Sequence, residues 1–467
     1  MTGQTAASQL AGFAAACRDQ IPAEALDDAV GRVVDCVGNA LAASASDDPG
    51  EPHVALYRVL SEQGGRAESS LLVRGQRLPA PSAALINGAL AHALDFDDTH
   101  LPSVLHPSAS VVPAALAVAE AQGASGRALL TSVAVGNEIT NRLGMSAYVP
   151  EQRNSTFFVR GQHATSICGT IGAAVAAGLL LGADEDQLVS VLGIAASMGA
   201  GILEANRTGG TVKRIHCGWA AHAGIEAARF AMAGVTGPPT VFEGGFGFLR
   251  AYLGDDYRLE PLVAGLGTHW ELLRTVYKPY PSNHFTHPII DCALALRADG
   301  LRAQDIDSAE IGVPRTVLRT LAEPWPDKVR PKTPYHAKFS GPYTFASAMI
   351  GGGGLGLHLA DFTDAALNDP DRLRLCSRVS MSGDPVCDEE FPLAFSAVVR
   401  VKTVDGQTLD KRVHSSRGGP EHPLSADDLQ TKFRLNAEQA LTAAEAAALA
   451  GRLRSLPDVG KVGPLVY

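Results

Sequence analysis

The chain has 467 residues, of which 46% are hydrophobic and 19% charged, and its formal net charge is −10. This composition is typical of a globular protein of about two or three domains and excludes a largely disordered chain. The acidic balance argues against nucleic-acid binding, because proteins that bind the phosphate backbone present a basic surface. The seven scattered cysteines form no Cys-x-x-Cys pair, which indicates structural thiols in a reducing compartment.

The N-terminal two thirds of the chain predicts a succession of helices, because apolar residues recur there at helical spacing. Ala and Gly are frequent in these segments, so neighbouring helices can approach closely. The predicted helices cover residues 26–44, 78–94, 108–123, 126–144, 163–182, 184–201 and 218–234. A basic leader and an unbroken apolar stretch of about 20 residues are both missing from the sequence, so we expect a cytoplasmic protein without a membrane span.

The pattern changes near Tyr277. Residues 306–317 alternate as a strand does, and residues 396–416 predict a β-hairpin that turns at Asp405-Gly406. A helical pattern returns from about Pro423. We therefore predict a mainly α fold, with a large helical domain over residues 1–274 and 416–467 and a smaller α/β lid domain over residues 275–415.

Two glycine-rich segments, residues 243–254 and 351–356, match neither the phosphate-binding loop nor the dinucleotide-binding fingerprint. We interpret both as turns that end helices. The sequence also lacks a Gly-x-Ser-x-Gly nucleophile motif, which argues against a serine hydrolase.

The segment AHALDFDDTH, residues 91–100, places acidic groups and histidines in an apolar helical neighbourhood. Its Asp-x-Asp-x-Thr pattern occurs in phosphatases of the haloacid dehalogenase type, but those need a preceding buried strand, and a helix is predicted here. Ligand spacing typical of metal sites is not found. A helix cap by Asp97 or Asp98 would explain one carboxylate but not the cluster.

Several histidines stand where a turn rich in Gly or Pro meets a helix, a position from which side chains can converge on a pocket. A lone histidine is usually structural, but histidine is also the usual side chain for acid–base chemistry near neutral pH. These histidines are His106, His163, His216, His284 and His287.

Basic side chains suggest an anionic substrate. Lys213 has apolar neighbours in the segment GGTVKRIHCGW, so we expect it to be partly buried and able to hold a carboxylate, whereas Arg214 can equally be an exposed residue. Arg160 and Arg207 are candidates for bidentate carboxylate binding.

A series of segments, taken in order, resembles the MmgE/PrpD family. They are AHALDFDDTH with HPSASVVPAALAVAE, GNEITNRLG, RGQHATSICGTIGAA, GTVKRIHCGWAAHAG, KPYPSNHFTHPIID and AKFSGPYTFASAM. The resemblance implies a large all-α domain with an α/β lid, and usually a homodimer. Family members include 2-methylcitrate dehydratase, cis-aconitate decarboxylase and iminodisuccinate epimerase. They act on small di- or tricarboxylates, and the resemblance implies no metal and no organic cofactor.

The resemblance also assigns site residues by matching motifs. They are Asp95, Thr99, His106, His163, Lys213, Tyr343 and a histidine of the segment PSNHFTH, for which we choose His284 over His287. His163 and His106 would be the acid and the base, in an order that the sequence leaves open. Lys213 would bind substrate carboxylates with Arg160 or Arg207.

The remaining residues have supporting roles in this hypothesis. Asp95 would orient a histidine, Thr99 would form a hydrogen bond with the substrate, and Tyr343 would donate a proton or close the pocket. His287 would contact the substrate. The leading hypothesis is a hydro-lyase similar to 2-methylcitrate dehydratase. The alternatives are a dicarboxylate epimerase, a cis-aconitate decarboxylase and a non-catalytic carboxylate-binding protein.

Overall fold

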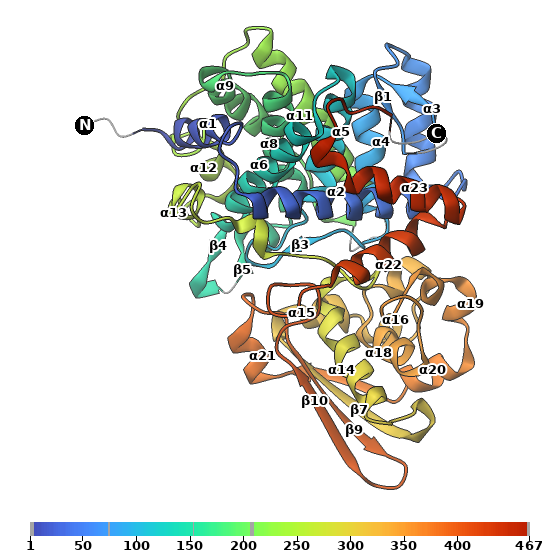
Figure 1. Ribbon diagram of the computed structural model, residues 1–467. Helices are drawn as coiled ribbons and strands as arrows, with labels where there is room; N and C mark the ends of the chain where they lie inside the picture. Colours follow the sequence, from blue (N-terminus) through green and yellow to red (C-terminus); the bar gives the residue numbers. More distant parts are fainter. Residues whose placement is uncertain (1–3, 73–74, 153, 206–209, 465–467) are drawn as a thin grey trace. The chain divides into compact units, whose positions relative to one another are not determined.

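The computed structural model describes the chain apart from residues 1–3, 73–74, 153, 206–209 and 465–467 (Figure 1). The chain divides into two compact units. The first contains Met1–Ala93, Asp97–Thr275 and Phe433–Tyr467, and the second contains Leu94–Phe96 and Val276–Lys432. Helices dominate and the only sizeable sheet in the described part lies in the second unit, so the predicted mainly α fold is confirmed. In the described part of the chain, helices are too short or too polar to cross a membrane.

The first unit is a helical body with a few two-residue strands. Its helices are α1 (Ala6–Ala16), α2 (Ala23–Ser44), α3 (Pro52–Gln63), α4 (Ala80–Ala93), α5 (Ser108–Gln122), α6 (Gly126–Met145), α7 (Thr156–Val159), α8 (Ala164–Leu180), α9 (Glu185–Ala196), α11 (His216–Met232), α12 (Phe248–Leu253), α13 (Glu260–Val263) and α23 (Ala443–Arg454). Its short strands are β1 (Ser69–Ser70), β2 (Arg77–Leu78), β3 (Thr99–His100), β4 (Tyr148–Val149) and β5 (Asn154–Ser155).

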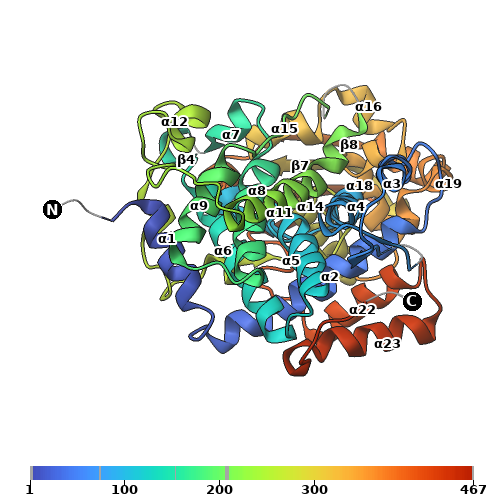
Figure 2. The ribbon, with the colours of Figure 1, turned by 90° about the horizontal axis from the view of Figure 1, so that it is seen from above.

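Helix α11 packs against α4 and α8 (Figure 2). The contact with α4 is made by backbone, because a Cβ atom on Gly218 would lie 2.0 Å from the carbonyl oxygen of Leu85. Gly88 makes the reciprocal contact, since a Cβ there would lie 2.8 Å from Cα of Gly218. Glycine at these two positions therefore sets the separation between the C-terminal half of α4 and the start of α11.

The second unit contains a four-stranded sheet in the order β10-β9-β7-β8. Strands β7 (Ile306–Val313) and β8 (Val379–Gly383) are parallel, and β9 (Ala397–Thr403) is antiparallel to both β7 and β10 (Thr408–Val413). Strand β6 (Thr275–Val276) lies where the first unit ends. The helices of this region are α14 (His287–Ala298), α15 (Arg315–Leu321), α16 (Trp325–Val329), α17 (Pro334–Ala337), α18 (Gly341–Ile350), α19 (Asp364–Leu367), α20 (Pro370–Cys376), α21 (Pro385–Glu390) and α22 (Ala426–Ala437).

The predicted helices of the first two thirds are confirmed, and so is the hairpin at Asp405-Gly406, where Gly406 has a φ of 87°. Three predictions need correction. The strand predicted over residues 306–317 ends at Val313, because Pro314 follows and α15 begins at Arg315. The glycine-rich segment 243–254 contains α12, which its last residue, Gly254, ends.

The third difference concerns the return to the first unit, which the structure places at Phe433 rather than at residue 416. Long-range hydrogen bonds explain it. The backbone N–H of Tyr277 donates to the carbonyl of Gly418 at 3.0 Å, and the backbone N–H of Arg417 donates to the Asp291 carboxylate at 2.9 Å. These bonds hold the segment after the hairpin in the second unit.

Candidate functional site

A buried ion pair stands at the end of α4. Nδ1 of His92 lies 2.7 Å from Oδ2 of Asp97, and both side chains are almost completely buried. Burial by itself would lower the pKa of His92, but the Asp97 carboxylate opposes this and the pKa rises to about 10. His92 is therefore an imidazolium at neutral pH, paired with a carboxylate.

The next aspartate fixes the chain between α4 and α5. Oδ2 of Asp98 accepts hydrogen bonds from Arg32 at 3.2 Å and from the Ser108 hydroxyl at 2.6 Å, and its Oδ1 accepts from the backbone N–H of Ser108 at 3.3 Å. Burial raises the pKa of Asp98 to about 6, against the opposing effect of Arg32. Asp98 thus accepts the hydrogen bond of the first backbone N–H of α5. A helix cap by Asp97 or Asp98 was one interpretation of the sequence, and this contact is of that kind.

His106 is positioned by this fixed loop. Its Nδ1 lies 2.6 Å from the carbonyl oxygen of Asp98 and 3.2 Å from the hydroxyl of Thr99. A carbonyl only accepts hydrogen bonds, so Nδ1 carries the hydrogen and Nε2 is the nitrogen that can exchange a proton with a substrate. Oδ2 of Asp97 lies 3.9 Å from the same Nδ1, where it stabilises positive charge on His106.

A second pair of histidines joins α8 to α11. His163 precedes α8, His216 begins α11, and their Nδ1 atoms are 2.9 Å apart. One of these nitrogens must donate and the other accept, so the two rings are opposite tautomers. Burial, followed by the charge of Lys213, lowers the pKa of His163 well below its ordinary value, and burial with the charges of His92 and Lys213 lowers that of His216 to about 4. Both rings are neutral at neutral pH.

We call His92, His106, His163 and His216 the histidine cluster. The ring centroid of His92 lies 5.4 Å from that of His106 and 5.7 Å from that of His163, which is itself 5.0 Å from His216. Lys213, in the 3-10 helix Thr211–Ile215, is 8% exposed. Its charge helps to lower the pKa of His163 and His216 and opposes the rise in the pKa of His92. Neutral and charged imidazoles beside a buried ammonium form a site suited to moving protons on an anionic substrate.

The second unit holds a separate charged pair. Asp95 has a φ of 54°, in the left-handed region that aspartate tolerates better than most residues. Its Oδ1 and its carbonyl oxygen accept hydrogen bonds from Nζ of Lys278, at 2.8 and 2.9 Å. Lys278 is fully buried. Asp95 is thus paired with Lys278, whereas Asp97 is the aspartate whose carboxylate lies 2.7 Å from a histidine ring, that of His92.

The remaining predicted residues of the second unit are also buried. The rings of His284 and His287 stack with centroids 4.6 Å apart, and Nε2 of His287 donates to the carbonyl of Ser282 at 3.2 Å. Burial, with the charge of Lys278, lowers the pKa of His287 to about 3. The Tyr343 hydroxyl donates to the carbonyl of Asp361 at 2.7 Å, and burial raises its pKa to about 12.

The structure therefore brings together the predicted residues of the first unit, which are Thr99, His106, His163 and Lys213. It places Asp95, Tyr343, His284 and His287 in the second unit. Arg160 is exposed and donates to the carbonyl of Tyr252 at 2.9 Å, and Arg207 lies outside the described residues. Sequence reasoning assigned no role to His92, His216 or Lys278.

Comparisons with known proteins cover most of the chain. The model of the MmgE/PrpD N-terminal domain matches residues 8–260, and that of the C-terminal domain matches residues 280–454. A cis-aconitate decarboxylase of Homo sapiens is 30% identical over 387 residues, which are 82% of this chain and 78% of that protein. The mouse (Mus musculus) enzyme of the same name is 31% identical over 372 residues, 78% and 73% of the two chains. One from Aspergillus terreus is 27% identical over 377 residues, 77% and 75%.

Proposed function

Because the chain belongs to the MmgE/PrpD family and is a lyase of that family, we propose that it removes carbon dioxide from cis-aconitate or a closely related unsaturated tricarboxylate. The observation that carries the proposal is that the relatives matching most of the chain are named cis-aconitate decarboxylases. They support the decarboxylase alternative better than our leading hypothesis of a hydro-lyase for 2-methylcitrate.

The reaction defines what the site must supply. The bond between the departing carboxylate and its carbon breaks, the electron pair stays on that carbon and spreads over the allylic system, and carbon dioxide leaves. A proton from an acid then forms a C–H bond, and solvent later returns a proton to that acid. The site therefore needs positive charge near the remaining carboxylates and one placed proton donor.

The histidine cluster and Lys213 meet both needs. The Lys213 ammonium binds a substrate carboxylate and stabilises the negative charge as it spreads. His106 is the proton donor in its imidazolium form and acts through Nε2, because the carbonyl of Asp98 holds its Nδ1 hydrogen and Asp97 stabilises the charge. His163 donates or accepts a hydrogen bond at the substrate through the nitrogen that is not paired with His216.

Dehydration of 2-methylcitrate is the second candidate, and the neutral state of His163 favours it. A hydro-lyase needs a base that takes a proton from carbon as well as an acid for the leaving hydroxyl. The neutral imidazole of His163 and the imidazolium of His106 would provide such a pair. The two reactions differ in their products, so one spectroscopic experiment separates them.

The test is proton NMR in D₂O with chelator-treated protein and a panel of cis-aconitate, citrate, 2-methylcitrate and racemic substituted succinates. We expect the olefinic signal of cis-aconitate to disappear and new methylene signals to appear, with one deuterium in the product. Loss of water from 2-methylcitrate while cis-aconitate persists would instead establish the hydro-lyase. A panel that remains unchanged would contradict both reactions.

Two expectations from the resemblance belong to the same proposal, namely a homodimer and a cytoplasmic location. Size-exclusion chromatography with light scattering tests the first, and twice the chain mass of 48.7 kDa is expected. A monomer over the micromolar range would contradict it. Fractionation of the source cells tests the location, and recovery outside the cytoplasmic fraction would contradict it.

A further inference from the structure

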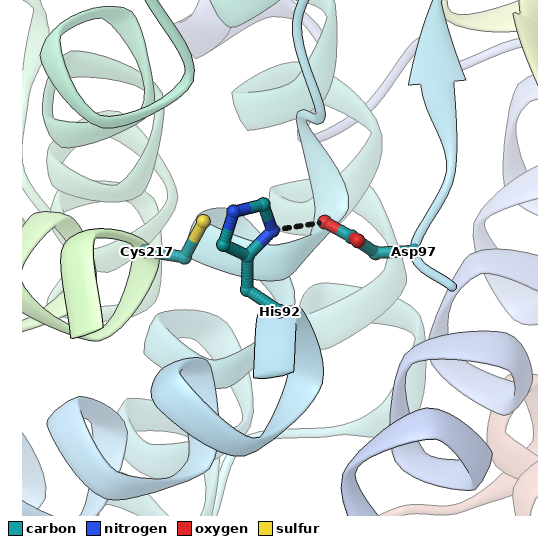
Figure 3. A group of neighbouring side chains, drawn as sticks. All are labelled: His92, Asp97 and Cys217. Carbon is teal, nitrogen blue, oxygen red and sulfur yellow. Dashed lines mark hydrogen bonds and ion pairs between the residues drawn. The ribbon is translucent and has the colours of Figure 1, made fainter. Parts of the chain in front are cut away.

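One group of side chains has the donor atoms of a metal site. Among the residues that the structure describes, a nitrogen of His92, a carboxylate oxygen of Asp97 and the sulfur of Cys217 lie within 4.8 Å of one another, and all three residues are buried. Figure 3 shows the imidazole between the carboxylate and the sulfur, with one ring nitrogen facing each. The proposed decarboxylation uses neither Cys217 nor this side of the His92 ring.

Among the described residues, the ring nitrogen of His92 that faces Cys217 has no hydrogen-bond partner. Nδ1 of His92 is bound to Asp97, whereas Nε2 is buried and has no hydrogen-bond partner among the described residues. A buried polar atom without a hydrogen-bond partner lowers the free energy of unfolding by about 1–3 kcal/mol. The nearby thiol is only a weak hydrogen-bond donor or acceptor. The orphaned nitrogen and the adjacent sulfur therefore indicate a ligand that both can bind.

The two donor residues are held by rigid elements. His92 lies one turn after Gly88 on α4, and Cys217 directly precedes Gly218 on α11. These two glycines are the points at which the helix backbones touch, so the separation of the donors is fixed by packing. Tetrahedral zinc sites, with Zn–N near 2.0–2.1 Å and Zn–S near 2.3 Å, require donor atoms about 3.5 Å apart. The ligand atoms of the group lie within 4.8 Å of one another, so side-chain adjustments can bring the donors to that spacing.

We propose that Nε2 of His92 and Sγ of Cys217 bind a divalent cation of the zinc class, with Asp97 orienting the imidazole through Nδ1. Nitrogen and sulfur donors suit Zn²⁺ and Co²⁺ rather than Mg²⁺ or Ca²⁺. A carboxylate on the second nitrogen is the usual partner of a metal-binding histidine. The cation replaces the Nε2 hydrogen and the thiol hydrogen, so the thiolate and the Asp97 carboxylate balance its two charges. Water completes the coordination.

The proposed cation is not a cofactor that the proposed reaction requires. Coordination replaces the Nε2 hydrogen of His92 and the thiol hydrogen of Cys217, and the proposed decarboxylation uses neither. Cation binding therefore does not rest on the proposed function. The experiment therefore reads binding and not activity, so failure of one proposal leaves the other standing.

The test is titration of the chelator-treated full-length protein with Co²⁺ alone. Thiolate coordination gives a charge-transfer absorption in the near ultraviolet, which we expect to saturate at one equivalent and to disappear when Zn²⁺ displaces the cobalt. Cys217→Ser should abolish this absorption. Asp97→Asn should retain it with affinity about 10–100-fold lower, as expected for a residue that orients a ligand.

Cys168→Ser is the matched control, because Cys168 is also fully buried, on α8, and should leave the titration unchanged. Circular dichroism shows whether each variant folds. If Cys217→Ser does not fold, X-ray absorption of the zinc-loaded wild type decides, with one sulfur and one imidazole expected in the coordination shell. The proposal is overturned if the wild type gives no thiolate absorption, if Cys217→Ser keeps it, or if the zinc shell contains no sulfur.

Discussion

The substitution Asp97→Asn tests the buried His92–Asp97 pair through the pH dependence of stability. Asp97 holds the pKa of His92 at about 10 in the folded protein, above its ordinary value of 6.5. Since the folded state holds this proton more tightly than the unfolded state, the stabilisation is complete below pH 6.5. It declines as the pH rises from 6.5 and is gone above about pH 10.

The structure gives the size of the effect. The free energy of unfolding should fall by about 1.4 kcal/mol per pH unit across this interval, or about 5 kcal/mol in all. Without the carboxylate, burial lowers the pKa of His92, so Asp97→Asn should lack this decline. Urea unfolding followed by circular dichroism, from pH 6 to 10, measures it for the wild type and the variant.

Asp255→Asn is the control, because the Asp255 side chain is 80% exposed and the substitution should leave the pH profile of the wild type unchanged. If Asp97→Asn keeps the same decline of stability between pH 6.5 and 10 as the wild type, then Asp97 does not hold the His92 proton. The charge assignment of the whole histidine cluster would then be wrong.

His163→Ala should lower kcat by about 10²- to 10⁴-fold with an unchanged far-ultraviolet circular dichroism spectrum, and near-wild-type turnover would remove His163 from the mechanism. Lys278→Met leaves the Asp95 carboxylate buried without its ammonium partner and should lower the free energy of unfolding by about 3–5 kcal/mol. Adding Asp95→Asn should recover part of this loss in urea unfolding, and strictly additive losses would argue against the pair. Gly218→Ala places a Cβ 2.0 Å from a carbonyl oxygen of α4 and should cost about 1–3 kcal/mol, so an unchanged Tm would contradict the close helix contact.

The helices could be predicted because their signals are local. Apolar spacing and flanking Gly or Pro residues define α2, α4, α5 and α6 to within a few residues. The boundary near residue 416 could not be predicted in the same way. It depends on hydrogen bonds that Arg417 and Gly418 form with residues far away in sequence, and such pairings leave no periodic pattern.

The candidate site was predicted in part. Motif matches identified His106, His163 and Lys213, which the structure brings into one cluster. The partners of the aspartates were not predictable, because Asp95 and Asp97 stand two residues apart in one motif. The left-handed backbone of Asp95 accompanies its pairing with Lys278, whereas Asp97 pairs with His92.

His92 and Lys278 received no role from the sequence, because their sequence context carries little information about function. His92 stands in an Ala-rich helix, where a histidine is usually structural, and its only signal is an acidic residue one turn beyond the helix end. Lys278 is a single cation before a Pro-rich turn. Both residues form buried ion pairs, with Asp97 and Asp95. Their burial follows from packing between segments that are distant in sequence, which the local sequence does not reveal.

The most direct test of the proposed decarboxylation is ¹³C NMR with cis-aconitate labelled in its carboxylates. The wild-type protein should release labelled carbon dioxide and bicarbonate in equal amount to the unsaturated dicarboxylate formed, and His163→Ala should release neither. Labelled cis-aconitate that persists unchanged with folded wild-type protein, while 2-methylcitrate loses water, would contradict the decarboxylase and establish the hydro-lyase.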